Sequence, residues 1–78
     1  MEINEIIEVI VKALVDNPEK VEINTVDGDR VTIYELKVVK EDIGKVIGKR
    51  GRTAGSIRTL LNAISTKQGK RSELEIIE

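Results

Sequence analysis

Apolar residues recur at helical spacing in the first part of the chain. They occupy positions 3, 6, 7, 10 and 14, which follow the i, i+3, i+4 pattern of one helix face. The pattern predicts a helix over about residues 3–16, with Asn4 as its N-cap and Pro18 ending the run. Apolar residues at positions 9, 11, 13 and 15 widen the stripe to roughly 240°. This wide arc indicates either a self-association surface or deep burial along the helix edges.

Two runs rich in β-branched residues follow, at residues 21–26 and 30–39. They flank an Asp-Gly-Asp sequence at 27–29, and Asp-Gly between such runs is typical of a β-hairpin turn. In the second run, Tyr34, Leu36 and Val38 share one face, whereas the apolar residues at positions 31 and 33 fall on the other. The pattern therefore leaves room for a bulge or a change of face within this strand.

Two further helices are predicted around a glycine-containing connection. Residues 40–47 form a short helical segment, with Glu41 and Asp42 in its first turn, where the helix dipole favours anions. Gly48 suits the left-handed conformation that closes a helix. Residues 51–66 then carry apolar side chains at positions 54, 57, 61 and 64, which predicts a second helix with one buried side.

Residues 72–77 alternate apolar residues with glutamates, which predicts a closing strand. The element order is then α-β-β-α-α-β. The two helices before the last strand form a crossover long enough to make that strand parallel to the second. We therefore expect one domain over residues 1–78, of the α+β class, with a three-stranded mixed sheet and three helices on one face.

Composition narrows the possible functions. The 78 residues contain neither cysteine nor histidine, which removes disulfides, thiolate metal sites and the commonest general base. The serines have no histidine to activate them, and the glycine-lysine spacing of a P-loop is absent. Glu41 and Asp42 form an acidic pair, but no third metal ligand accompanies them. We expect no enzyme activity, no metal and no cofactor.

The sequence also lacks the pattern of a membrane segment. No apolar run approaches the roughly 20 residues that span a bilayer. The first residues are acidic, unlike the basic start of a secretory signal. We therefore expect a cytoplasmic protein without a membrane partner.

Charge is divided along the chain, although the net charge is only −1. Residues 1–39 hold four cations and nine anions, whereas residues 40–71 hold nine cations and two anions. The basic block surrounds Gly48-Lys49-Arg50-Gly51, a stretch of bare backbone and two cations at a helix N-terminus, which suits a phosphate chain. The alternatives are a solvated, lysine-rich helix face and an ordinary tight turn between two helices.

These residues resemble a known signature. One stretch of the chain resembles the signature of KH domains. It reads Ile43-Gly44-Lys45-Val46-Ile47-Gly48-Lys49-Arg50-Gly51-Arg52, and Ile57 follows six residues beyond Gly51. The element order resembles the type II, prokaryotic form of that domain, over essentially the whole chain. The sequences Asn17-Pro18-Glu19 and Gly69-Lys70-Arg71 narrow the resemblance to the small single-domain bacterial KH proteins of the KhpA (YlqC-like) family.

The resemblance implies an RNA-binding protein that acts as an RNA chaperone or post-transcriptional regulator. It also implies a homodimer, or a heterodimer with a larger KH-containing protein of the KhpB (Jag/EloR) type. Through that partner the family is linked to cell elongation, cell shape and cell wall biogenesis, including peptidoglycan homeostasis. These roles follow from the resemblance alone.

In the KH binding mode, the two-glycine loop clamps the backbone of about four unpaired nucleotides of single-stranded RNA. The residues expected to bind RNA are the loop, its flanking cations and an apolar floor beneath the bases: Gly48, Lys49, Arg50 and Gly51; Lys45 and Arg52; Ile43, Val46 and Ile47. One departure from the family pattern is Gly55, where relatives more often carry a larger, frequently basic residue.

A second interpretation is a protein-protein dimerisation module whose partner makes the main RNA contacts. Its interface would use the broad apolar arc around Val9, or Leu60 in the third helix. Double-stranded nucleic acid and DNA are a third option for the ligand. Single-stranded DNA in particular is an alternative to single-stranded RNA, because a backbone clamp discriminates poorly between these two.

Overall fold

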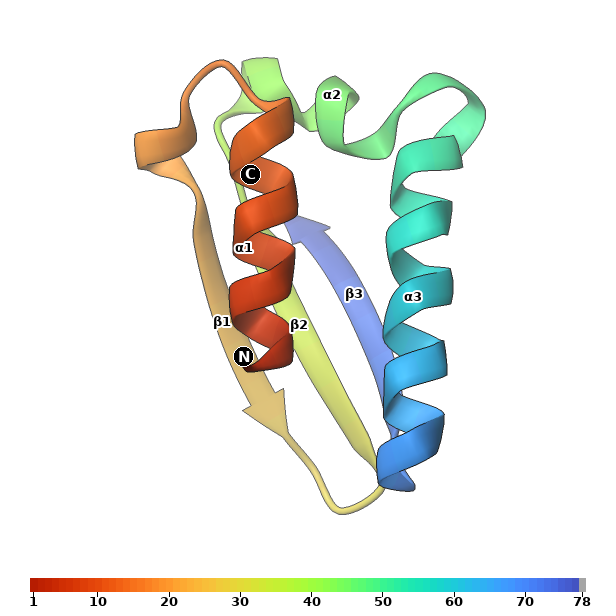
Figure 1. Cartoon of the computed structure of the whole chain (residues 1–78). Coiled ribbons are helices and arrows are strands. Elements are labelled where there is room, and N and C mark those ends of the chain that lie inside the picture. Colours follow the sequence, from red (N-terminus) through yellow and green to blue (C-terminus); the bar gives the residue numbers. More distant parts are fainter. Residues whose placement is uncertain (78) are drawn as a thin grey trace.

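The computed structural model describes residues 1–77 and contains the main elements in the expected α-β-β-α-α-β order (Figure 1). These elements are α1 (Ile3–Leu14), β1 (Glu22–Asp27), β2 (Val31–Lys37), α2 (Ile43–Ile47), α3 (Arg52–Gln68) and β3 (Arg71–Ile77). Short 3-10 turns lie between them: η1 (Pro18–Lys20), η2 (Lys40–Asp42) and η3 (Lys49–Gly51). Within residues 1–77, no helix has the length and apolar character needed to cross a membrane.

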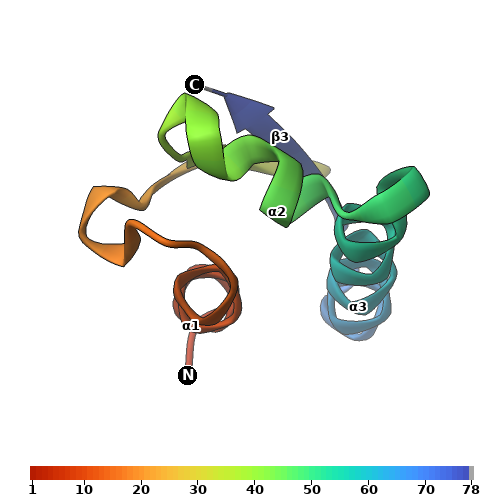
Figure 2. The ribbon, with the colours of Figure 1, turned by 90° about the horizontal axis from the view of Figure 1, so that it is seen from above.

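The strands form one mixed sheet in the order β1-β2-β3. β1 pairs antiparallel with β2, and β3 pairs parallel with β2, as the crossover predicted. Both pairings run without interruption, so β2 contains no bulge. Thr32, Tyr34 and Leu36 of β2 are buried, whereas the residues between them are only half-buried. Figures 1 and 2 show the helices on the same side of the sheet, which confirms the expected architecture.

The hydrophobic core lies between this sheet and the helices. Ile7 and Val11 of α1, Leu36 of β2 and Val46 of α2 have no exposed surface. Burial of one such side chain contributes about 1.5–3 kcal/mol to the free energy of unfolding. Val46 is the one buried side chain of α2, so this short helix is held to the core mainly at a single point.

α1 differs from its prediction at its start. Its N-cap is Glu2 and not Asn4, because the Glu5 carboxylate reaches back 2.9 Å to accept a hydrogen bond from the Glu2 backbone N–H. The broad apolar arc of α1 is divided between two environments. Val11 lies in the core, whereas Val9 is 61% exposed. Deep burial therefore accounts for only part of the arc.

Polar contacts link the end of α3, and the residues that follow it, to β3 and to the hairpin between β1 and β2. Gly69 closes the helix in the left-handed conformation, and a hydrogen bond between Ser65 and Ser72 joins α3 to β3. Next to Gly69, Lys70 places its ammonium 2.6 Å from an Asp27 carboxylate oxygen. The hydrogen bond from Lys70 lowers the pKa of Asp27. These contacts set where β3 begins beside β2.

Asp42 is a buried carboxylate at the start of α2, with only 1% of its surface exposed. It accepts hydrogen bonds from the backbone N–H groups of Asp16 (3.3 Å) and Asn17 (3.0 Å), and from the Asn17 side-chain amide (3.1 Å). Burial alone would raise the pKa of Asp42, but these hydrogen bonds and the nearby Lys45 ammonium lower it below its ordinary value. The carboxylate thus joins the loop after α1 to the start of α2.

We expect Asp42→Asn to lower the thermal unfolding midpoint at pH 7 by about 10 °C, because the new amide turns one acceptor into a donor that faces other donors. Folding lowers the pKa of Asp42. Its stabilising effect is therefore complete above the ordinary pKa near 3.9, and is lost as the pH falls through the lower folded value. Circular dichroism melts at pH 7 and about pH 2.5 should show the difference from wild type shrinking in acid.

The control for this experiment is Asp16→Asn, which changes an exposed carboxylate beside the same loop. It should shift the midpoint by no more than a few degrees at either pH. An equal loss of stability for Asp42→Asn at both pH values would contradict the role assigned to the ionised carboxylate.

Candidate nucleic-acid interface

The loop between α2 and α3 has a backbone that depends on its glycines. Gly48 has φ 77° and ψ 171°, Arg50 has φ 58° and ψ 26°, and Gly51 has φ 72° and ψ 14°. The expected left-handed helical conformation is therefore wrong for Gly48, because its positive φ is combined with an extended ψ. That combination is essentially limited to glycine. The Gly51 N–H donates to the Gly48 carbonyl over 3.1 Å and closes the turn.

Gly48 is also held in a tight space. A Cβ atom on Gly48 would lie 2.7 Å from the Thr53 Cβ and 2.9 Å from the Thr53 backbone nitrogen. The same atom on Gly44, Gly51 or Gly55 would meet nothing within 4 Å. Bare backbone therefore faces open space on α2, on the loop and on α3, where a ligand backbone can approach closely.

The N-terminus of α3 lies at this loop. Its N-cap is Gly51, the Arg52 N–H donates to the Lys49 carbonyl, and no side chain bonds to the amides that follow. The helix continues for 17 residues, so the positive end of its dipole lies at the loop. Uncapped amides at such an end are suited to a phosphate group.

The cations around the loop fall into two groups. Lys49, Arg50 and Arg52 are exposed, and none of them forms an ion pair within the part of the chain that the structure describes. Lys45 instead places its ammonium 3.3 Å from an Asp16 carboxylate oxygen, beside the end of α1. Of the four predicted cations, the structure therefore leaves three available to a ligand.

The predicted apolar floor is smaller than expected. Val46 points into the core and is fully buried, so its assignment to the floor is wrong. Ile43 is half-buried and packs against the core, whereas Ile47 is 39% exposed. At about 100° per residue, Ile47 and Lys45 lie on roughly opposite flanks of α2. Ile47 is thus the side chain of α2 with most apolar surface to offer, on the flank away from α1.

A hollow of about 310 Å³ lies between α3 and β3. We call it the α3–β3 seam, and its lining residues are Arg58, Asn62, Arg71, Ser72, Glu73, Leu74 and Glu75. The Arg58 guanidinium donates a hydrogen bond to the Leu74 carbonyl over 3.3 Å, which fixes the middle of α3 against the middle of β3. In Figure 1, the start of α3 and the end of β3 lie at the same end of the molecule as α2.

The seam includes the free edge of β3. The Ile77 carbonyl accepts from Val38, and the Arg71 N–H donates to Arg30, so the odd-numbered residues of β3 bond toward β2. Backbone groups alternate in direction along a strand. The N–H and C=O groups of Ser72, Leu74 and Ile76 therefore face outward, toward the seam.

Sequence reasoning missed the residues that α3 contributes to the seam. Arg58 and Asn62 are spaced at i and i+4, so they share one face of α3. That face is next to the buried one that carries Ala54 and Leu61. The sequence shows this spacing, but only the position of β3 in the structure shows that this face of α3 lies at the seam.

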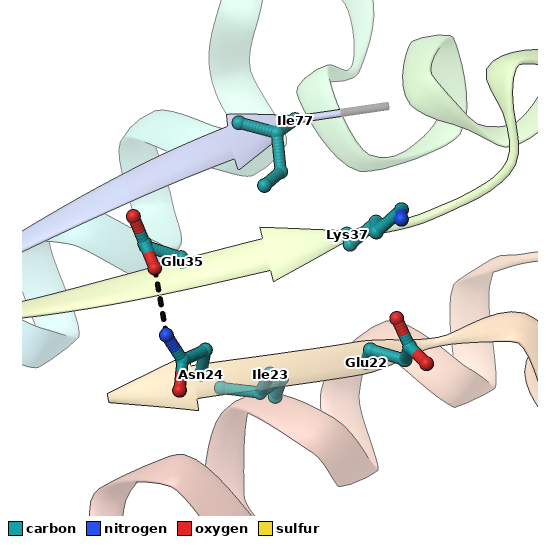
Figure 3. A pocket seen from close by; sticks show the side chains of 6 residues that line it. All are labelled: Glu22, Ile23, Asn24, Glu35, Lys37 and Ile77. Atoms are coloured by element: carbon teal, nitrogen blue, oxygen red, sulfur yellow. Dashed lines mark hydrogen bonds between the residues drawn. The ribbon is translucent and has the colours of Figure 1, made fainter. Parts of the chain in front are cut away.

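A further hollow lies on the sheet face away from the helices (Figure 3). Its lining residues are Glu22, Ile23, Asn24, Glu35, Lys37 and Ile77, and the Asn24 side-chain amide donates to Glu35 over 2.9 Å. Two carboxylates against a single cation do not suit a phosphate chain. The loop surface is therefore the better candidate for nucleic acid.

Comparison with known proteins places this arrangement in a family. The family model described as KhpA/KhpB, KH domain, matches residues 4–76. The chain belongs to the KhpA/KhpB KH-domain family. This confirms the resemblance and the KH fold inferred from the sequence.

Three curated relatives share the name RNA-binding protein KhpA. The protein from Caldanaerobacter subterraneus subsp. tengcongensis is 55% identical over 73 residues, covering 94% of this chain and 97% of the relative. The protein from Borreliella burgdorferi is 50% identical over 74 residues, covering 95% and 90%. The protein from Aquifex aeolicus is 46% identical over 76 residues, covering 97% and 96%. Their shared name denotes a binding protein and not an enzyme.

The loop geometry predicts that its two glycines differ in their tolerance of a side chain. Gly48→Ala should lower the free energy of unfolding by about 3 kcal/mol or more, because the methyl group meets Thr53 and the backbone conformation is unsuitable. Gly51→Ala should cost only about 1–2 kcal/mol, since its side chain would enter open space at a left-handed position. Urea unfolding measures both values. Equal costs would contradict the tight contact assigned to Gly48.

Proposed function

We propose that this KhpA/KhpB-family chain binds single-stranded RNA, and that the loop Gly48–Gly51 clamps the sugar-phosphate backbone of about four nucleotides. One observation carries the proposal. A bare-backbone loop at the uncapped start of a 17-residue helix is surrounded by Lys49, Arg50 and Arg52, which have no ion-pair partner within residues 1–77. The name RNA-binding protein KhpA, which the relatives share, supports RNA as the ligand.

Each part of the loop has a separate role in this proposal. The amides at the start of α3 bind a phosphate, and Gly48 and Gly51 let the RNA backbone approach. Lys49, Arg50 and Arg52 neutralise neighbouring phosphates. Ile47 supplies apolar contact for a base on the flank of α2, with a smaller contribution from half-buried Ile43. Val46 acts only indirectly, by anchoring α2 to the core.

The proposed cellular role follows from family membership. We propose a cytoplasmic RNA chaperone or post-transcriptional regulator that acts with a larger KhpB (Jag/EloR)-like partner in cell elongation, cell shape and cell wall biogenesis. The family model that covers both KhpA and KhpB supports a relationship between such proteins. We expect a single domain to bind RNA weakly, with a dissociation constant that is micromolar or poorer. A dimer would then bind more tightly, because its two domains can bind one RNA together.

Charge reversal in the loop tests the RNA site. Lys49→Asp/Arg50→Asp should abolish binding to a fluorescent single-stranded RNA in an anisotropy titration, because it replaces two phosphate-binding cations by anions. Three cations predict a slope of log affinity against log salt of about −2.1, or about a 20-fold loss between about 50 and 200 mM salt. A slope near −2.8 would mean that Lys45 leaves Asp16 to act as a fourth contact.

The matched control is Lys12→Asp/Lys20→Asp, which makes the same change in net charge away from the loop. It should retain most of the affinity. If both double variants fold and bind equally well, or if the wild type does not bind RNA, the proposed clamp is wrong. The same titration with single-stranded DNA and with duplex RNA compares the alternative ligands.

A second proposed role is association through the outer faces of α1 and α3. An apolar hollow of about 340 Å³ is lined by Ile10 and Leu14 of α1 and by Leu60 of α3, among others. Leu60 is 54% exposed and Leu14 is 40% exposed, so two large apolar side chains are accessible at one hollow. This surface supports the proposal of a homodimer, or of a heterodimer with a KhpB-like protein.

We expect Leu60→Glu to convert a dimer into monomers, because the carboxylate would be buried without a partner in an apolar contact. Sedimentation equilibrium at several protein concentrations measures the change. Val9→Glu is the comparison, since Val9 is similarly exposed but does not line the hollow. A Leu60→Glu protein that remains dimeric would exclude this interface.

A further inference from the structure

A polar hollow lies at the end of the molecule away from the glycine loop. Its volume is about 220 Å³, and its walls come from the start of α1, from β1 and β2, and from the end of α3. Figure 1 shows these parts together at the end of the molecule opposite α2. The volume is below the roughly 300–1,000 Å³ of pockets for drug-sized ligands, so it suits a ligand of a few heavy atoms. We call it the Tyr34 hollow.

Tyr34 brings an unpartnered polar group to this hollow. Only 7% of the residue is exposed, and its hydroxyl forms no hydrogen bond within residues 1–77. No fully buried polar side-chain atom in the same residues lacks a hydrogen-bond partner. The hydroxyl is therefore the exposed part of the side chain. Since Tyr34 lines the hollow, the hydroxyl opens into it, with its donor and its acceptor both unused.

The charged groups that line the hollow are mainly negative. Glu2 and Asp27 contribute carboxylates, and Lys70 contributes the one ammonium among the lining residues. The Lys70 ammonium lies 2.6 Å from Asp27 Oδ1, and the Thr32 hydroxyl donates to the same oxygen over 3.1 Å. Asp27 Oδ2 accepts no hydrogen bond within residues 1–77. One acceptor of this carboxylate thus remains free beside the hollow.

The pKa of Tyr34 reflects these charges. Burial raises the pKa, and the carboxylates of Asp27 and Glu2 raise it further. The Lys70 ammonium lowers the pKa by a smaller amount. The hydroxyl therefore keeps its proton at neutral pH and lies in a negative potential.

The two helices that end at the hollow do not reverse this potential. α3 ends at Gln68, which lines the hollow, so the negative end of a 17-residue helix dipole lies there. The start of α1 presents a positive end. It is offset by the Glu5 carboxylate, which accepts a hydrogen bond from the Glu2 N–H over 2.9 Å. The surroundings thus favour a cation over an anion.

We propose that the Tyr34 hollow binds a small alkylammonium cation, held between the Tyr34 hydroxyl and the carboxylates of Asp27 and Glu2. An ammonium group only donates hydrogen bonds, and the hydroxyl oxygen and Asp27 Oδ2 both accept them. The bonds to the carboxylates are charge-assisted and therefore stronger than neutral ones. An anion would be repelled by two carboxylates and would find only the Lys70 ammonium, which is already paired.

Tyrosine fluorescence provides the first test. Tyr34 is the one tyrosine of the chain, which contains no tryptophan and no phenylalanine, so the signal reports this hollow directly. Putrescine should change the fluorescence to saturation with a dissociation constant of about 1 mM or tighter, which a ligand of few heavy atoms can reach. The neutral isostere 1,4-butanediol and the dianion succinate, compared at matched ionic strength, should bind at least about ten-fold more weakly.

Two variants test the groups that hold the cation. Tyr34→Phe removes a hydroxyl that has no protein partner, and Glu2→Gln removes one negative charge. Each should weaken putrescine binding at least about five-fold. Because Tyr34→Phe removes the fluorophore, the backbone amide signals of Gly28 and Lys70 follow the titration in nitrogen-15 NMR spectra. The matched control is Glu19→Gln, which removes the same charge outside the hollow and should bind as wild type does.

The proposal is overturned if wild type shows no saturable response, or if putrescine and 1,4-butanediol bind equally. It is also overturned if neither Tyr34→Phe nor Glu2→Gln weakens binding. Circular dichroism verifies that both variants fold, and Glu2→Gln decides alone if Tyr34→Phe does not. Lys49→Asp/Arg50→Asp should retain putrescine binding, because the glycine loop lies at the other end of the molecule (Figure 1).

Discussion

The geometry of the candidate site depends on the buried carboxylate of Asp42. α2 has only five residues, far too few to be stable as an isolated helix. The buried Val46 side chain packs this helix against the core. At the start of the helix, Asp42 accepts three hydrogen bonds from the loop after α1. The glycine loop continues directly from α2. Its direction is therefore set by contacts that do not belong to the loop itself.

The fold also separates unlike charges onto different surfaces. The free cations gather where α2, the loop and α3 meet, whereas the hollow on the open sheet face carries the carboxylates of Glu22 and Glu35. The parallel register of β3 adds to this separation, because it pairs Glu75 with Glu35 and so places both residues on the same sheet face. A polyanion is thus attracted to the loop and repelled by the open sheet face.

Most of the fold could be predicted from the sequence, because its patterns are local. Helical periodicity places α1 and α3, the Asp-Gly turn places the hairpin, and the crossover length makes β3 parallel. The details that failed depend on distant residues. Asp42 accepts hydrogen bonds from Asp16 and Asn17, 26 and 25 positions away, and Lys45 pairs with Asp16. In a helix as short as α2, periodicity also could not decide that Val46 is its one fully buried side chain.

Arg50 is the only non-glycine residue with a positive φ within residues 1–77. A glycine at this position would adopt the same conformation more easily, but it would also adopt many others. The Cβ of arginine removes most of those alternatives, so the free loop samples fewer shapes. A ligand that fits the observed shape then loses less conformational entropy on binding. The side chain that supplies charge at the loop tip thereby also makes the loop more rigid before any ligand arrives.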